Sequence, residues 1–187
     1  MGCRTFWITP CIPIFYFFHI FEPHLPYEPA ERFLAEYGPT YEAEIATADA
    51  VVGDLLDHLR ALGIYEKAIV IVTSDHGEGL GDHGEEQHSL LLYREALQVP
   101  LFLKLPGSAG GGRRVPAPVQ LSDILPTVTS LLGLPTPQGV SGRSLLVSAA
   151  EGASPRTLYG ETLYPRLQLG WADLKSAVDG RWHYIHG

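Results

Sequence analysis

The chain has 187 residues, 45% of them hydrophobic and 18% charged, which allows one domain of ordinary size and excludes a chain that is disordered throughout. Twenty-one acidic residues against thirteen basic ones give a formal net charge of −8 at pH 7. This balance argues against a nucleic-acid-binding surface and a polybasic membrane anchor, because both need clustered Lys and Arg. The acids and the eight histidines together can bind a divalent metal ion.

The N-terminal part is predicted to be irregular over residues 1–13 and then to enter a buried strand. Residues 5–21 are strongly apolar, but two prolines and His19 interrupt the run, and it is short for a membrane-spanning helix. A signal peptide is the weaker alternative, since no small-x-small cleavage site follows. The segment 14–21 (IFYFFHIF) is aromatic and β-branched on both faces, which is typical of a strand buried on both sides. The sequence does not identify a cellular compartment.

The middle of the chain predicts alternating helices and strands. Between Pro39 and Gly63 apolar residues recur every three or four positions, which predicts one long amphipathic helix that ends at Gly63. The apolar runs 68–75 and 99–105 predict two more strands, joined by a glycine-rich polar loop and a short helical stretch near 89–97. Strand, helix and strand form a βαβ unit. We therefore expect an α/β fold with a mostly parallel sheet flanked by helices.

The C-terminal part changes character. Residues 122–133 predict a helix with Ser122 as its N-cap. The segments 156–162 and 174–185 are strand-like, and Asp179-Gly180 is a strong signal for a hairpin turn. The sequence thus predicts three parts, which are an irregular stretch (1–13), an α/β domain (14–147) and a small antiparallel β subdomain (148–187).

Side chains that can bind a metal ion follow the first two predicted strands. His19, Glu22 and His24 lie near the end of the first, and Asp75 and His76 directly follow the second. The loop after them adds Glu78, Asp82, His83, Glu85 and His88. Ligands of open α/β sheets bind at the carboxyl ends of the strands. The sequence therefore predicts a metal site at this edge of the sheet.

The segment T-S-D-H-G (73–77) is well suited to binding a metal ion. A carboxylate and an imidazole at the end of a strand can share one cation, and Gly77 allows the backbone to turn sharply. Neighbouring strand residues point to opposite faces, so Asp75 and His76 can bind the same ion only where the strand breaks. The alternative is structural, with Asp75 capping a helix and His76 in solvent.

Several of these motifs resemble, in the same order, those of the sulfatase family of the alkaline phosphatase superfamily. H-I-F-E-P-H-L-P-Y-E-P (19–29) is similar to the family's H-x-x-D-P-H-x-P-Y-x-P segment. The family's most recognisable C-terminal stretch is similar to T-S-D-H-G-E-G-L-G-D-H-G-E (73–85) followed by H-S-L-L-L-Y-R-E-A-L-Q-V-P-L (88–101). The resemblance continues in L-S-D-I-L-P-T-V (121–128), G-R-S-L (142–145) and D-G-R-W-H-Y-I (179–185). It implies an alkaline-phosphatase-like fold, of which this chain would hold the C-terminal part and which would be incomplete.

The resemblance also implies roles for single residues. Asp75 and His76 would bind the divalent cation of the active site, with calcium as the first expectation and manganese or zinc as alternatives. His24 would contact the ester oxyanion or the leaving group, and His88 would face the substrate as the second catalytic histidine. Gln87 would be a substrate-binding position, where many sulfatases have Lys.

The nucleophile of the family is a Cys or Ser in C/S-x-P-x-R, converted to formylglycine. Cys11 and Pro13 match part of this motif, but Phe15 stands in place of the Arg, so we expect no nucleophile in this chain. The family's upstream pair of metal-binding acids is also not found.

Three functions remain open. The first is metal-assisted hydrolysis of sulfate esters of small molecules or glycans. The second, favoured by His76 and Gln87, is hydrolysis of phosphate or phosphonate esters on the same scaffold. The third is a catalytically inactive, truncated remnant that folds in part or binds a partner. The oligomeric state does not follow from the sequence.

Overall fold

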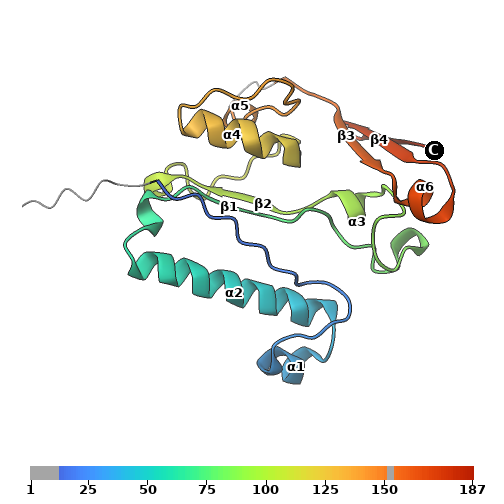
Figure 1. Cartoon of the computed structure of the whole chain (residues 1–187), viewed down its shortest axis with the longest axis horizontal. Helices are drawn as coiled ribbons and strands as arrows, with labels where there is room; N and C mark the ends of the chain where they lie inside the picture. Colours follow the sequence, from blue (N-terminus) through green and yellow to red (C-terminus); the bar gives the residue numbers. More distant parts are fainter. Residues whose placement is uncertain (1–12, 151–153) are drawn as a thin grey trace, which may run out of the picture. The chain divides into compact units, whose positions relative to one another are not determined.

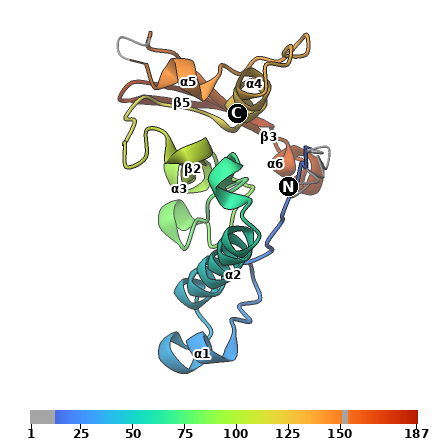
Figure 2. The same ribbon diagram turned by 90° about the vertical axis from the view of Figure 1, so that its left-hand side faces the viewer.

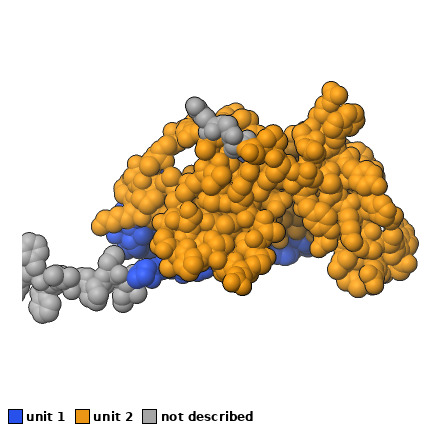
Figure 3. Space-filling view, turned by 90° about the horizontal axis from the view of Figure 1, so that it is seen from above, with its two compact units in different colours: residues 1–65 blue, residues 66–187 orange. Residues whose placement is uncertain are grey.

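The structure is a computed structural model that describes residues 13–150 and 154–187. The chain divides into two compact units, Met1–Tyr65 and Glu66–Gly187, which Figure 3 shows in two colours. This division does not test the predicted boundary between residues 147 and 148, which stays a prediction. In the part of the chain that is described, no helix is both long enough and apolar enough to span a membrane.

The first unit holds two helices, α1 (Glu31–Tyr37) and α2 (Tyr41–Ala61), of which α2 is much the longer (Figures 1 and 2). The Thr40 hydroxyl accepts a hydrogen bond from the Ala43 amide and caps α2, and Gly63 adopts a left-handed φ of 68° just beyond its end. The predicted long helix is therefore confirmed.

The predicted strand at 14–21 is wrong, because the segment has no regular secondary structure. Its side chains are largely exposed, with Phe15 at 82% and Phe17 at 75% of full exposure. A strand forms only where a neighbouring strand satisfies its backbone N–H and C=O groups, and within residues 13–150 and 154–187 no strand pairs with this segment. The βαβ unit that depended on it is therefore not found in the described structure.

The second unit begins with a two-stranded sheet of β1 (Val70–Thr73) and β2 (Leu101–Lys104). The strands are antiparallel, with Thr73 opposite Leu101, so the expected parallel arrangement is wrong for this pair. The reason lies in the connection, since a parallel pair needs a crossover, usually a helix. Here the described connection holds only the short turn η2 (Asp82–Gly84) and the four-residue helix α3 (Arg94–Leu97), which is shorter than the predicted stretch 89–97.

The next segment is built around a buried acid. The turn η4 (Leu121–Asp123) leads into α4 (Ile124–Leu131), and the fully buried Asp123 carboxylate accepts hydrogen bonds from the Gln120 and Arg143 amides. The predicted Ser122 cap is wrong, because the Gln120 side chain and the Asp123 carboxylate form the capping box instead.

The C-terminal strands form the predicted antiparallel sheet, in the order β3-β4-β5; β3 and β4 are labelled in Figure 1 and β5 in Figure 2. A turn at Asp179 and Gly180 joins β4 to β5, and Gly180 has a left-handed φ of 57°, as the hairpin signal predicts. The elements of this region are β3 (Leu158–Thr162), α6 (Tyr164–Leu169), β4 (Leu174–Asp179) and β5 (Trp182–His186). The remaining short elements are η1 (Tyr65–Lys67), η3 (Pro106–Ser108) and α5 (Leu145–Ser148).

Candidate active site

Strand β1 ends at Thr73, just before the predicted metal ligands Asp75 and His76. The Ser74 hydroxyl donates a hydrogen bond of 2.7 Å to the His76 carbonyl, and the His76 amide donates one of 3.1 Å to Asp75 Oδ1. Because the strand ends at Thr73, Asp75 and His76 need not point to opposite faces. Asp75 Oδ1 and His76 Nε2 lie 3.8 Å apart, and no helix begins here for Asp75 to cap.

The His76 ring is held in the orientation that a metal ligand needs. Its Nδ1 lies 2.9 Å from the Gly77 carbonyl oxygen, which can only accept, so Nδ1 carries the hydrogen and the lone pair of the neutral ring is on Nε2. Metal–oxygen and metal–nitrogen bonds to such ligands are about 2.0–2.6 Å long. Two donor atoms 3.8 Å apart can therefore share one cation, so Asp75 and His76 fit the proposed role.

A second histidine joins them from the other end of the loop. The rings of His76 and His88 stack, with centroids 3.9 Å apart and planes at 26°. His88 Nδ1 lies 3.3 Å from both carboxylate oxygens of Glu78, and the side chains of His88 and Glu78 are only 17% and 6% exposed. Glu78 is a candidate metal-binding side chain by its sequence position, whereas in the folded loop its carboxylate faces His88. Residues 78–88 form no strand or α-helix, so no regular period relates Glu78 to His88 and only the folded loop reveals the pair.

Two glycines and a buried acid hold this loop in place. A Cβ atom at Gly77 would lie 1.9 Å from the Glu95 carbonyl oxygen, and one at Gly79 would lie 2.2 Å from the Glu85 carbonyl oxygen, so neither position tolerates a side chain. The buried Glu85 carboxylate accepts hydrogen bonds from the amides of Leu90 (2.7 Å) and Leu91 (3.1 Å), directly after His88. Glu85 is therefore a structural residue of the site.

Asp75, His76 and His88 line a cavity of about 1500 Å³ within the second unit. Residues of the C-terminal sheet line the same cavity, among them Tyr159 of β3 and Trp182 of β5. The arrangement combines a carboxylate and an imidazole 3.8 Å apart with a histidine whose Nδ1 faces a carboxylate, at the edge of a space large enough for a substrate.

The sequence profile of the Sulfatase family matches residues 12–134. This chain belongs to the sulfatase family. It is 40% identical over 111 residues to arylsulfatase K of Bos taurus, covering 59% of this chain and 20% of that protein. It is 35% identical over 107 residues to an ulvan-active sulfatase of Formosa agariphila, covering 56% of this chain and 21% of that protein. The chain therefore spans about a fifth of the length of these curated sulfatases.

Solved structures confirm the α/β, alkaline-phosphatase-like fold, of which this chain covers a part. The structure matches a phosphonate monoester hydrolase of Silicibacter pomeroyi with a TM-score of 0.68 and 26% identity. The match covers 79% of this chain and 32% of the hydrolase. The sulfatase scaffold is thus shared with enzymes named for another ester chemistry.

The remaining positions of the sulfatase-like motifs are His24, Gln87 and Cys11. His24 belongs to the first unit, where its Nδ1 lies 2.6 Å from the Leu25 carbonyl oxygen and its ring stacks on Phe21. Gln87 is exposed and is not among the residues found to line the large cavity, although its neighbour His88 is. Cys11 lies outside the described residues. The catalytic and substrate-binding roles of His24, His88 and Gln87 therefore stay predictions.

The remaining histidine of the loop, His83, has a different environment. Its Nδ1 lies 2.6 Å from Glu95 Oε1 and its ring stacks on Tyr93, with centroids 3.8 Å apart. The pKa of Glu95 is lowered, chiefly by a hydrogen bond from its own backbone amide; burial opposes this, and the hydrogen bond and charge of His83 add to the lowering.

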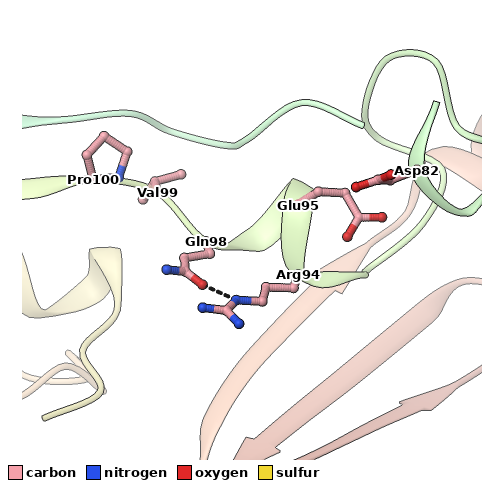
Figure 4. Close-up of a pocket in the computed structure, with 6 residues that line it drawn as sticks. All are labelled: Asp82, Arg94, Glu95, Gln98, Val99 and Pro100. Atoms are coloured by element: carbon pink, nitrogen blue, oxygen red, sulfur yellow. Dashed lines mark hydrogen bonds between the residues drawn. The ribbon is translucent and has the colours of Figure 1, made fainter. Parts of the chain in front are cut away.

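Glu95 also lines a second cavity, of about 520 Å³, together with Asp82 and Arg94 (Figure 4). Figure 4 shows the Asp82 and Glu95 carboxylates near one end of it and the hydrogen bond from Arg94 to Gln98. Within the described ranges, 13–150 and 154–187, no group of three or more His, Cys, Asp or Glu side chains is arranged to hold a metal ion.

Proposed function

We propose that this sulfatase-family protein hydrolyses sulfate esters with the help of a divalent cation bound by Asp75 and His76. The observation that carries the proposal is the broken end of β1, where Asp75 Oδ1 and His76 Nε2 lie 3.8 Å apart beside the stacked ring of His88. The membership in the sulfatase family and the sulfatase relatives support the same reaction. We expect the nucleophile to come from a part of the protein other than these 187 residues.

The side chains of this chain then have distinct tasks. Glu78 holds Nδ1 of His88, so the opposite ring nitrogen, Nε2, is the atom that can reach an ester oxygen and assist the leaving group. His24 contributes a second contact to the ester oxyanion or the leaving group. A cation bound by Asp75 and His76 supplies positive charge for the nonbridging oxygens of the ester.

Calcium is the cation we propose, because the Asp75 carboxylate is the hard anionic oxygen that it prefers. The imidazole of His76 also suits manganese or zinc, which remain the alternatives. Calcium takes six to eight ligands. Asp75 and His76 supply two of these ligands in our proposal, and backbone carbonyls, water molecules or other side chains of the protein would supply the rest.

The substrates we propose are sulfate esters of small molecules or glycans. A second reaction, hydrolysis of phosphonate or phosphate esters, is favoured by one observation, the structural match to a phosphonate monoester hydrolase. Gln87 agrees with this alternative, because many sulfatases have Lys at this position.

The test compares the active sulfatase with its Asp75→Asn variant on 4-nitrophenyl sulfate, 4-nitrophenyl phosphate and phenyl phosphonate esters. We expect aryl sulfate to be the best substrate and the variant to lose both turnover and bound cation, as measured by elemental analysis. The matched control is Asp49→Asn, an exposed acid on α2. A preference for phosphonate esters would favour the second reaction, and unchanged cation content in Asp75→Asn would refute the metal assignment.

A further inference from the structure

The backbone directly after His88 has an uncommon conformation. Ser89 has a φ of 87°, in the left-handed region that residues with a side chain rarely adopt. Such a conformation persists only where its surroundings hold it. Ser89 lines the large cavity together with His88, so the contacts that hold Ser89 bear on the position of the proposed catalytic histidine.

Two side chains hold the peptide group between Ser89 and Leu90 from opposite ends. Its N–H group, which belongs to Leu90, donates a hydrogen bond of 2.7 Å to the buried Glu85 carboxylate. Its carbonyl group, which belongs to Ser89, accepts a hydrogen bond of 2.7 Å from the Thr162 hydroxyl. Because a peptide group is planar, hydrogen bonds to its N–H and to its C=O together fix its orientation.

The Thr162 hydroxyl is itself held in one direction. Thr162 is the last residue of β3 and pairs with Leu174 of β4. Its hydroxyl oxygen accepts a hydrogen bond of 3.2 Å from the Tyr164 amide at the start of α6, and its single hydrogen is donated to Ser89. Branching at Cβ further restricts the rotation of the threonine side chain. The C-terminal sheet thus presents a fixed donor to a residue 73 positions earlier in the chain.

The His88 ring needs a precisely placed backbone. The ring stacks on His76 at 3.9 Å between centroids, and its Nδ1 lies 3.3 Å from both carboxylate oxygens of Glu78. A turn of the peptide group after His88 would move the ring away from both neighbours. In enzymes generally, a displacement of about 1 Å at a reacting group can cost about 100-fold in rate.

We propose that Thr162 is a positioning residue of the active site, which holds the backbone of His88 through the carbonyl of Ser89. This inference rests on the proposed function, because His88 is the histidine that we propose to assist the leaving group. It goes beyond that function by giving the C-terminal sheet a task in the reaction. In this task Thr162 touches neither the ester nor the cation, and it acts only through His88.

Two substitutions of Thr162 in the active sulfatase test the inference by kinetics. Thr162→Val keeps the shape of the side chain and removes the hydroxyl, whereas Thr162→Ser keeps the hydroxyl and removes the methyl group. We expect kcat for 4-nitrophenyl sulfate to fall about 10–100-fold in Thr162→Val, with a smaller change in KM, as for other residues that orient an active-site group. Thr162→Ser should keep most of the parent's kcat.

The matched control is Thr136→Val. The Thr136 hydroxyl lies 2.9 Å from the Thr129 hydroxyl, so the control removes one side-chain hydrogen bond of similar length within the same unit. Thr136 is not among the described residues that line the large cavity. A mere loss of stability would leave the kcat of the folded enzyme unchanged in both valine variants. We therefore expect the control to keep the parent's kcat.

Hydrogen exchange, followed by mass spectrometry on the same proteins, gives a readout that does not depend on turnover. In Thr162→Val the peptide group before Leu90 keeps its bond to Glu85 but loses the one that holds its carbonyl. We expect faster exchange in the segment that contains Leu90 and Leu91, and no such change in Thr136→Val.

The two readouts separate this inference from the proposed function. Equal kcat in Thr162→Val and Thr136→Val, or a kcat that Thr162→Ser does not preserve, overturns the inference even where aryl sulfate is hydrolysed. Unchanged exchange around Leu90 in Thr162→Val overturns it whatever the substrate. A parent enzyme that prefers phosphonate esters contradicts the sulfate reaction alone, and the same comparison of kcat on a phosphonate ester then decides the role of Thr162.

Discussion

At the scale of single residues, the pair of Glu78 and His88 links the loop's conformation to its chemistry. Both side chains are largely buried, and His88 also stacks on the proposed cation ligand His76. A carboxylate that holds one nitrogen of a histidine fixes the direction in which the other nitrogen points. The position of Nε2 in the cavity therefore depends on Glu78, which does not itself line the cavity in the described structure.

Glu78→Gln tests this dependence. The amide keeps the size of the side chain, but it presents one oxygen instead of two to His88 Nδ1. We expect kcat for aryl sulfate to fall about 10–100-fold, as for other residues that orient an active-site ligand, with a smaller change in KM. The control is Glu86→Gln, an exposed acid in the same loop. If the two variants have equal kcat, Glu78 does not position His88.

Gln87→Lys tests whether position 87 faces the substrate. An ammonium group beside His88 would add a charge that the amide lacks. We expect the ratio of aryl sulfate turnover to phosphodiester turnover to rise in the active enzyme. Because Gln87 is exposed, the change should cost little stability, and urea unfolding of the two proteins measures this. A flat ratio would show that position 87 lies off the substrate.

At the scale of secondary-structure elements, Asp123 joins segments that are far apart in the sequence. Its buried carboxylate accepts hydrogen bonds from the Gln120 and Arg143 amides and from both terminal nitrogens of Arg156. Next to it, the Thr127 hydroxyl donates to the Asp123 carbonyl and accepts from the Leu145 amide. These bonds tie α4 to the chain before α5 and before β3, and the neighbouring residues Gln120 and Ser122 line the large cavity.

Removing the Arg156 side chain, which carries the positive charge paired with Asp123, should destabilise the fold strongly. Arg156→Ala leaves the Asp123 carboxylate buried without its charged partner, which typically costs about 3–5 kcal/mol. The free energy of unfolding, measured with urea, checks this. The control is Arg166→Ala, an exposed arginine of α6, for which we expect a loss below about 1 kcal/mol. Equal losses in both variants would contradict the role of the pair.

The same cluster should make the fold sensitive to acid. Burial alone would raise the pKa of Asp123, but the hydrogen bonds from Arg156 and from the two amides outweigh it and lower the pKa below its usual value. Stabilisation by the carboxylate is therefore complete above the unfolded pKa of about 3.9 and is lost as the pH falls from there through the folded pKa. We expect Asp123→Asn to be less stable at pH 7 and to lose less of its stability between pH 5 and pH 2.

The elements that the sequence predicted correctly are those that local interactions determine. The apolar period, the Thr40 cap and Gly63 specify α2 within one stretch of chain, and Asp179-Gly180 specifies its hairpin in the same way. The segment 14–21 was wrongly predicted because a strand requires a partner, which its own composition does not supply. Within the site, Asp75 and His76 could be found from their motif, whereas the contact of Glu78 with His88 arises only when the loop folds.

At the scale of the whole molecule, the described part of the chain is a portion of a larger architecture. It spans about a fifth of the curated sulfatases and about a third of the matched hydrolase structure. The aromatic side chains of 14–21 are exposed, and within residues 13–150 and 154–187 no group of three or more His, Cys, Asp or Glu side chains could hold a metal ion. Both features are what a domain shows when its neighbouring segments complete the core and the metal site.

We therefore expect the 187-residue chain, expressed alone, to have no hydrolase activity. Catalysis in this family needs a covalent nucleophile, and the partial motif at Cys11 lacks its arginine. Two ligands also bind a hard cation such as calcium weakly, because it takes six or more oxygens. The exposed residues Phe15 and Phe17 should in addition make the isolated chain prone to aggregate, which light scattering measures.

The assay uses the purified chain with aryl sulfate, phosphate and phosphonate esters at saturating calcium, manganese and zinc. The Asp75→Asn variant of the same chain is the control, since it removes the anionic cation ligand without changing the size of the side chain. Turnover at the level of the blank in both proteins is the expected result. Turnover that exceeds the blank and disappears in Asp75→Asn would mean that these residues carry a nucleophile and a cation site of their own, because an impurity would not respond to a substitution in this chain.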